Sequence, residues 1–174
     1  MADRDTHTPD WLPDARRGAR PALRHARAVG IAVLVAVLVA AIVNVFGQRR
    51  AISTSRAPAA DLTVSAPERI RTGLIDELRI TIRPHREIEA PRIVLSPEWN
   101  HQVTFNTVSP EPAAHGYTDG PVLAYGPLDA GGILEIAIQF QVNPTAVGRR
   151  DWSVRLQDGE RTVAVVERSA VIFP

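Results

Sequence analysis

Apolar and polar positions follow two different patterns along the chain. Residues 28–47, AVGIAVLVAVLVAAIVNVFG, are apolar without a break except for Asn44. From Asp61 to Pro174 apolar residues instead alternate with polar ones, most clearly along 78–83 and 134–142. A continuous apolar run predicts a helix without a polar face, whereas alternation predicts strands of an antiparallel sheet with one buried face.

The run at 28–47 predicts one transmembrane α-helix. As a helix, 20 residues span about 30 Å, the thickness of the hydrocarbon core of a bilayer. Twelve of them are Leu, Ile, Val or Phe, which together contribute very roughly −4 to −7 kcal/mol toward insertion. The run is longer than the core of a signal peptide, about 7–15 residues, and Gln48-Arg49-Arg50 follows it instead of a small-residue cleavage site. We therefore expect an uncleaved anchor.

The arginines beside the run predict its orientation. Five lie on the N-terminal side and three on the C-terminal side: Arg16, Arg17, Arg20, Arg24 and Arg27 against Arg49, Arg50 and Arg56. By the positive-inside rule, residues 1–27 form a basic tail in the cytoplasm, which is too poor in apolar residues to fold alone. Residues 1–56 hold nine Arg and four Asp, whereas 57–174 hold 11 Arg and 15 acids. We therefore expect a single-pass protein of the cytoplasmic membrane whose C-terminal domain is extracytoplasmic.

Small residues recur at intervals of four within the apolar run. They are Ala32, Ala36 and Ala40, and Asn44 follows at the same spacing. Small residues at this spacing let two helices approach closely, and an Asn can donate a hydrogen bond across the interface. The stripe favours a homodimer or another membrane protein as partner, but the abundance of Ala in the chain accounts for it equally well.

The rest of the chain predicts a short stalk and an all-β domain. Residues 48–60, QRRAISTSRAPAA, are polar or small and have no periodicity, so we expect a stalk there. Alternating runs punctuated by Gly and Pro then predict seven or eight short antiparallel strands over 61–174. Asp158-Gly159 predicts a tight hairpin turn. Strands of this number and length favour two packed sheets.

Composition excludes several classes of chemistry. The chain has no Cys, so disulfides, thiolate metal sites and a cysteine nucleophile are absent. Its 20 basic residues, all Arg, and its 19 acids leave a net charge of +1, which gives no overall attraction to nucleic acid. No catalytic motif with a Gly-x-Ser-x-Gly, His-Glu-x-x-His or phosphate-loop pattern occurs. We therefore expect no enzyme, no cofactor and no nucleic-acid partner.

Several features of residues 128–173 occur in a fixed order. They are Ala130-Gly131, the alternating run Leu134–Val142, Gly148, the run Trp152–Leu156 and Asp158-Gly159. This order resembles the C-terminal half of bacterial immunoglobulin-like modules of the CARDB adhesion-domain type. The N-terminal half departs from that pattern, because Arg83-Pro84-His85 stands where a polar Asn-Gly type turn is expected. The resemblance implies an immunoglobulin-like sandwich with a surface-binding or scaffolding role.

The candidate binding residues are a few side chains in and beside predicted loops. The longest irregular segment, 109–121, holds His115, Tyr117 and Asp119. One His and one Asp cannot complete a metal shell, so no metal site is expected. Trp99, Tyr117 and Tyr125 either stack on a sugar or a protein partner, or, for Trp99 and Tyr125, cover the core of the sandwich.

These patterns support three hypotheses about function. The first is a membrane-anchored accessory or scaffold protein whose immunoglobulin-like domain binds another membrane or envelope protein. The second is a module that binds cell-wall glycan or another ligand through Trp99, Tyr117 and Tyr125. The third and weakest is a hydrolase that uses His115.

Overall fold

A computed structural model describes residues 21–42 and 50–174, which belong to two separate units, Met1–Gly47 and Gln48–Pro174. The first unit contains the helix α1 (Pro21–Ile42). This helix begins seven residues before the predicted start at Ala28, so the prediction of an unfolded tail is wrong for 21–27. Pro21 is well suited to the first position of a helix, and the Ala, Leu and Arg residues after it have high helix propensity. Residues 43–47 and Asn44 lie outside the described residues.

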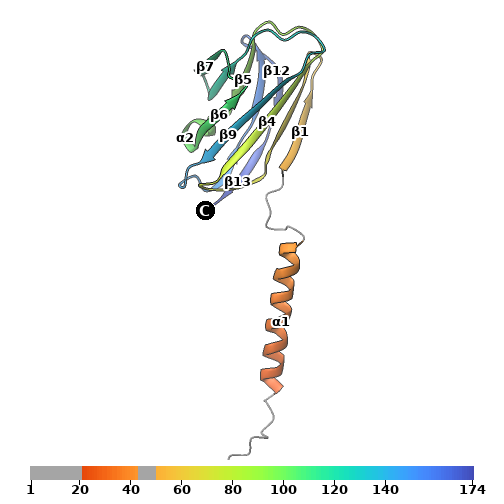
Figure 1. The fold of residues 1–174 in the computed structure, drawn as a ribbon, viewed down its shortest axis with the longest axis vertical. Coiled ribbons are helices and arrows are strands. Elements are labelled where there is room, and N and C mark those ends of the chain that lie inside the picture. Colours follow the sequence, from red (N-terminus) through yellow and green to blue (C-terminus); the bar gives the residue numbers. More distant parts are fainter. Residues whose placement is uncertain (1–20, 43–49) are drawn as a thin grey trace, which may run out of the picture. The chain divides into compact units, whose positions relative to one another are not determined.

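The second unit is a β-sandwich, as predicted (Figure 1). Its first sheet has the order β1-β2-β4-β9-β6, and every neighbouring pair is antiparallel. These strands are β1 (Arg50–Arg56), β2 (Ala60–Pro67), β4 (Ile75–Pro84), β9 (Leu134–Val142) and β6 (Val103–Ser109). The fold class is that of an all-β immunoglobulin-like sandwich, preceded in the chain by one apolar helix.

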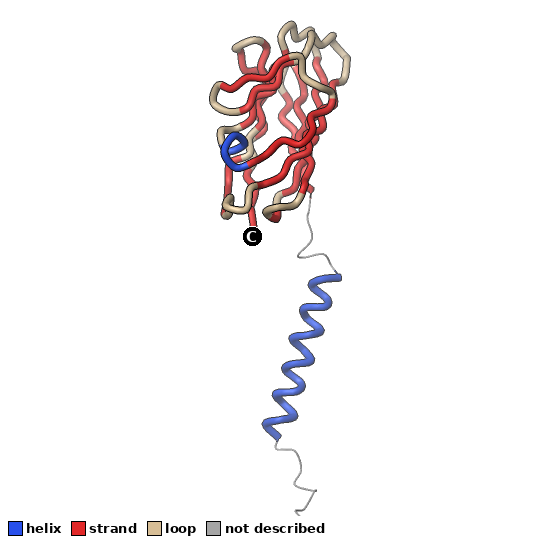
Figure 2. The backbone as a smooth tube through the Cα atoms, turned by 60° about the vertical axis from the view of Figure 1, so that its left-hand side comes forward, coloured by secondary structure: helices blue, strands red, loops and turns tan. Residues whose placement is uncertain are grey.

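The opposite side of the sandwich is built from two further sheets (Figure 2). The larger has the order β12-β11-β5-β8-β7, with β12 (Arg161–Val166), β11 (Val154–Asp158), β5 (Pro91–Leu95), β8 (Pro121–Ala124) and β7 (Ala114–Tyr117). The smaller is β10 (Gly148–Asp151), β13 (Ser169–Phe173) and β3 (Arg69–Arg71). The described residues thus contain more strands than the seven or eight predicted, and β13 pairs with β3 in parallel.

The core is filled by the inward positions of the alternating strands. Leu78 lies opposite Ile138 and Ile80 opposite Ile136, and all four side chains are at most 1% exposed. Residues from the three sheets join in one buried cluster. Because the polar positions between them face outward, the alternation in the sequence alone determines which face of each long strand is buried.

The hairpin predicted at Asp158-Gly159 is confirmed. Gly159 has a φ of 61°, in the region that favours glycine, and Asp158 pairs with Arg161 across the turn. The Asp158 carboxylate also accepts a hydrogen bond of 3.1 Å from the Ala90 backbone N–H. This bond ties the β11–β12 hairpin to the segment that leads into β5.

Two stretches predicted to be irregular are strands. The stalk predicted at 48–60 is wrong, because β1 pairs with β2 along its whole length, from Arg50 opposite Pro67 to Arg56 opposite Asp61. The inward residues of β1 are Ala and Ser, which are too small to produce a hydrophobic alternation. The loop predicted at 109–121 likewise contains β7, and the short helix α2 (Glu98–Gln102) was not predicted.

Arg168 joins β1 and β2 to the opposite side of the sandwich. It lies between β12 and β13, and its guanidinium donates hydrogen bonds of 2.9–3.0 Å to the backbone carbonyls of Ala51, Val64 and Ala66. Burial lowers the pKa of Arg168, and the charge of Glu68 opposes this shift. Since the three acceptors are more than 100 residues away in sequence, no local pattern marks this arginine.

Candidate functional site

Two shallow hollows lie side by side on the sandwich and share Pro97 and Asp119. The first has a volume of about 210 Å³, and its lining includes Arg155 on β11, Val165 on β12 and Glu167 directly after β12. In the second, of about 360 Å³, α2 faces the turn after β7. Its lining includes His101 and Tyr117.

Of the three carboxylates that line the first hollow, that of Asp151 is hydrogen-bonded. Asp151 accepts hydrogen bonds from Ser153, at 3.1 Å from the backbone N–H and at 2.5 Å from the hydroxyl. Ser96 donates to the backbone carbonyl of Asp151 at 2.9 Å. Among the described residues, no group of three or more His, Asp or Glu side chains is placed to hold a metal ion. The first hollow is therefore described as a polar depression in the surface.

Gly120 lies in the turn after β7, which lines the second hollow. A Cβ atom at this position would lie 2.1 Å from the carbonyl oxygen of Leu95, which is backbone and cannot move aside as a side chain can. The turn therefore packs directly on the end of β5. This close approach holds Asp119 and Tyr117 in place beside Pro97.

Trp99 is a core residue, so the hypothesis that it stacks on a partner is wrong. Its side chain is 1% exposed and packs against Trp152 and Phe140, with ring centroids at 4.3 Å and 5.0 Å. Phe105 adds a tilted contact at 5.9 Å. The alternative interpretation, in which Trp99 covers the core, is the one the structure shows.

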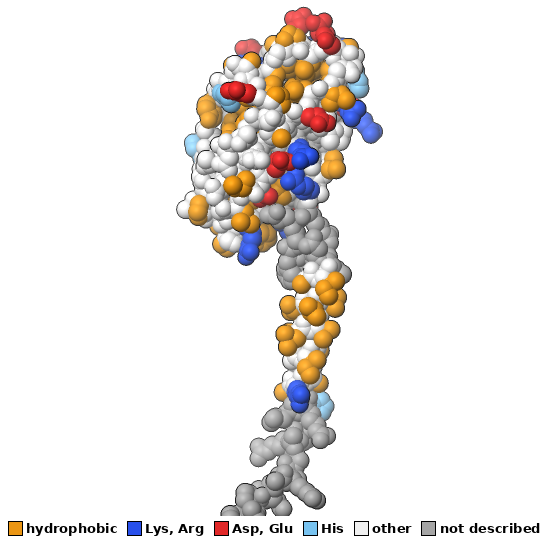
Figure 3. All heavy atoms as spheres, in the orientation of Figure 1, with side chains coloured by type: hydrophobic (Ala, Val, Ile, Leu, Met, Phe, Trp, Pro, Cys, Tyr) orange, Lys and Arg blue, Asp and Glu red, His pale blue; other side chains and the backbone are white. Residues whose placement is uncertain are grey.

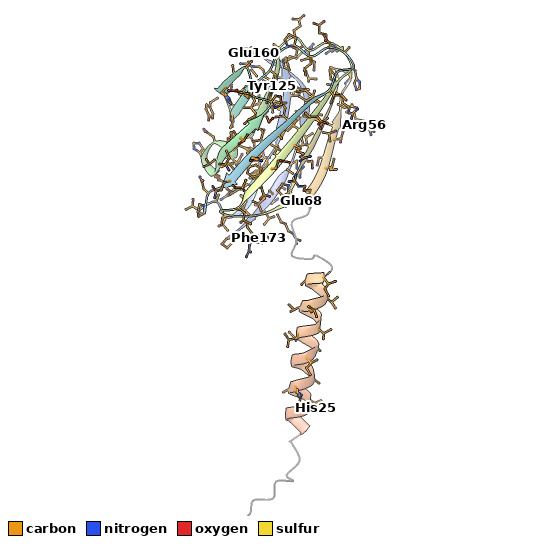
Figure 4. The ribbon with its side chains drawn as sticks, in the orientation of Figure 1. His25, Arg56, Glu68, Tyr125, Glu160 and Phe173 are labelled. Carbon is orange, nitrogen blue, oxygen red and sulfur yellow. The ribbon has the colours of Figure 1, made fainter. Side chains whose placement is uncertain are left out.

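Tyr125 directly follows β8 and is half-buried (Figure 4). Its hydroxyl donates to the carbonyl of Pro110 at 3.4 Å, and burial raises the pKa of Tyr125 to about 12. The ring packs against the edge of the core. Tyr125 lines neither of the two hollows.

His115 and Tyr117 lie on one face of β7, which is an edge strand of its sheet. Both side chains are exposed, Tyr117 to 69%. Tyr117 lines the second hollow, whereas His115 lines neither of the two. Of the four predicted contact residues, the structure thus brings only His115 and Tyr117 together.

The predicted helix-packing residues Ala32, Ala36 and Ala40 lie on α1, and none of them is buried within the protein. The 18 residues His25–Ile42 have a mean hydropathy of 2.2, and none of this stretch is buried. Figure 3 shows apolar side chains along the visible side of this helix. The packing role of the stripe remains a prediction, and Asn44 lies outside the described residues.

Comparison with known proteins adds a likeness of fold only. No family model matches the chain, and no curated protein matches it. The solved structures similar to it include the cohesin module of a family 33 glycoside hydrolase from Clostridium perfringens, with 10% identity and a TM-score of 0.44 over 66% of this chain and 96% of that one. Another is the third cohesin of ScaC from Acetivibrio cellulolyticus, described in complex with the ScaB dockerin, with 16% identity and a TM-score of 0.37 over 60% and 91%. The resemblance to CARDB-type modules remains a prediction.

Proposed function

We propose that this chain is a single-pass membrane protein whose β-sandwich binds a protein partner on the outer side of the cytoplasmic membrane. The observation that carries the proposal is the surface of α1. An 18-residue stretch of mean hydropathy 2.2 has no buried residue. An apolar surface of this size is stable only where water is excluded from it, and a lipid bilayer provides that environment.

The length of the helix supports a complete crossing of the bilayer. The 18 residues span about 27 Å as a helix, and the apolar sequence continues to Gly47. This length matches the hydrocarbon core of a bilayer, about 30 Å. Arg27 is the one Asp, Glu, Lys or Arg in the candidate span. It lies close to the N-terminal end, where a long side chain can reach the headgroups.

The fold of β1 supports an orientation with the N-terminus inside. Arg56 lies at the far end of this seven-residue strand, about 20 Å along it from Arg50. Only Arg49 and Arg50 then follow the apolar run closely, against five arginines before it. Five arginines before the run against two directly after it favour a cytoplasmic N-terminus.

The surface around Tyr117 supports a protein partner. An exposed tyrosine beside shallow hollows, with Arg155 in the lining of one of them, has the composition common at protein interfaces. Stacking of a glycan on all three aromatic residues is not supported, because Trp99 is buried and Tyr125 lines neither hollow. The Ala32, Ala36 and Ala40 stripe offers a second contact, with another copy of α1 or with a helix of the partner.

Cysteine labelling tests the orientation. The chain has no Cys, so Glu160→Cys in the full chain introduces the only thiol. We expect a membrane-impermeant maleimide to label it in intact spheroplasts but not in inverted vesicles. Asp3→Cys is the matched control and should give the opposite result. Labelling of Glu160→Cys in inverted vesicles alone would contradict the proposed orientation.

Photo-crosslinking tests the partner. A benzophenone amino acid in place of Tyr117 should form a discrete crosslinked product in membranes, whereas the same group at exposed Glu160 should not. Replacing Ala36 and Ala40 by Leu should lower the yield of that product if the helix stripe also contacts the partner. Equal products from Tyr117 and Glu160, or none from either, would contradict the proposed site.

A further inference from the structure

One end of the sandwich carries exposed apolar side chains close to where the chain enters the domain. We call this the basal end, because β1 begins there at Arg50. The side chains are Leu74, Ile75, Val147 and Phe173, with exposed fractions of 49%, 64%, 44% and 45%. We call these four residues the basal patch. Their exposure contrasts with the burial of apolar residues in the strands they adjoin.

Backbone pairing brings the four residues to the same end. The Thr72 N–H donates to the Phe173 carbonyl at 2.9 Å, and the Gly73 N–H donates to that of Val142 at 3.0 Å. Leu74 and Ile75 follow directly, and Ile75 begins β4. Gly148 pairs with Ile172, which places Val147 across from Phe173. Figure 4 shows Phe173 and Glu68 at this end of the domain and Glu160 at the opposite end.

Arg50 links the patch to the start of the domain. Its guanidinium donates to the carbonyl of Glu77 at 3.4 Å, and Glu77 lies two residues after Ile75 on β4. Gly47, the last residue of the apolar run, is three residues before Arg50. Three residues reach at most about 11 Å, which is little more than the headgroup layer on one side of a bilayer, about 5–8 Å.

We infer that the basal patch rests in the headgroup layer of the same membrane that α1 crosses. This inference depends on the membrane anchoring proposed above. The tether is too short to hold the basal end away from the lipid, and the patch offers apolar side chains to it. The exposed Arg71 and Arg149, next to Phe173 and Val147, match the negative charge of anionic headgroups. A domain held in this way presents its opposite end, with the Asp158-Gly159 hairpin, away from the membrane.

The test uses the full chain in liposomes of phosphatidylcholine and phosphatidylglycerol at a ratio of about 3:1, isolated by flotation. Single cysteines replace Ile75, Phe173 or, as the matched control, Glu160, and each carries an environment-sensitive fluorophore. A lipid with a spin label near its headgroup quenches the fluorophores it can reach. We expect quenching at positions 75 and 173 to be at least threefold stronger than at position 160.

Charge substitutions test whether the basal patch contacts the lipid or only lies close to it. With the fluorophore on Leu74→Cys, the double change Ile75→Glu and Phe173→Glu should reduce quenching by at least half. Ile133→Glu, at an exposed apolar residue beside β9 at the other end, should not change it. Equal quenching at all positions, or no effect of the Glu substitutions, would overturn the inference. A fluorophore that is shielded from water but not quenched would also overturn it, because another copy of the chain would then cover the patch.

The two proposals fail in different ways in this experiment. A chain that does not float with the liposomes contradicts the membrane anchoring, and the lipid contact with it. A chain that floats but shows no preferential quenching at the basal patch contradicts the lipid contact alone.

Discussion

The helix α1 and the sandwich use the same apolar residue types in opposite ways. Val35 on the helix is 52% exposed and Leu38 is 60% exposed, whereas Val64 and Leu62 on β2 are fully buried. In β2 the alternate residues Asp61, Thr63 and Ser65 are polar and face outward, so one face of the strand is buried by the opposite side of the sandwich. The apolar stretch of the helix has no polar face, and none of its described residues 25–42 is buried. The difference indicates that the two parts of the chain are stabilised by different surroundings.

The largest effect is expected when charge is placed in the middle of the helix. Val37→Arg together with Leu38→Arg should oppose insertion by about 6–8 kcal/mol, which is comparable to the whole apolar contribution of the run. We expect the full chain to leave the membrane fraction, while the thermal unfolding of the sandwich stays unchanged. Val37→Ile with Leu38→Ile is the control and should remain membrane-bound. A double Arg variant that stays in the membrane would contradict the account of α1.

The next largest effect is expected in the aromatic core of the sandwich. Trp99→Ala removes the ring that Phe105, Phe140 and Trp152 surround and should lower the free energy of unfolding by about 3–5 kcal/mol. Urea unfolding followed by circular dichroism measures this loss. Tyr117→Ala, at an exposed aromatic, should change it by less than about 0.5 kcal/mol. Similar losses in the two variants would show that Trp99 is not part of the core.

A smaller effect is expected where Arg168 joins the two sides of the sandwich. Arg168→Met removes the hydrogen bonds to Ala51, Val64 and Ala66 and should destabilise the domain by about 1.5–3 kcal/mol. Hydrogen exchange should increase most in β1, because it is the edge strand. Arg161→Met, at an exposed pair with Asp158, is the control and should change stability by less than about 1 kcal/mol. Unchanged exchange in β1 would contradict the role of Arg168.

The smallest effect concerns a buried carboxyl group at the start of β4. Asp76 is 8% exposed and its Oδ2 has no hydrogen-bond partner. Burial raises the pKa of Asp76, and the charge of Arg50 opposes this shift only in part. With the folded pKa above the unfolded value of 3.8, the carboxyl stabilises the fold at acid pH and loses this contribution as the pH rises through the folded pKa.

Asp76→Asn should therefore make the domain more stable than the native chain at pH 7, by about 1 kcal/mol. The difference should shrink as the pH falls toward 3. Unfolding curves at a series of pH values measure it, and Glu160→Gln, on the exposed hairpin, should stay within about 0.5 kcal/mol of the native chain. A difference that is the same at every pH would contradict the assigned cause.

The sequence predicts the parts of the fold that depend on local periodicity. The strands β4 and β9 could be predicted because they have three and five alternating apolar residues, and the hairpin at Gly159 because Asp-Gly favours its turn. The strand β1 could not, because its inward Ala and Ser side chains carry no hydrophobic signal. Its place in the sheet depends on pairing with β2 and on Arg168, which comes more than 100 residues later.

The candidate site was predicted only in part for the same reason. His115 and Tyr117 are two residues apart, so any strand places them on one face. Trp99 and Tyr125 lie near prolines in segments without periodicity, and their burial depends on distant residues such as Trp152 and Pro110. Sequence alone therefore cannot separate an aromatic residue that covers a core from one that binds a partner.

The central claim is that α1 anchors the chain in a membrane. The most direct test compares the flotation of the full chain with that of residues 48–174 alone. Both are mixed with liposomes, washed with alkaline carbonate and centrifuged through a density gradient. We predict that the full chain rises with the lipid and that residues 48–174 remain in the dense fraction as a folded β domain. The account is contradicted if the full chain stays in the dense fraction, or if residues 48–174 rise to the same extent.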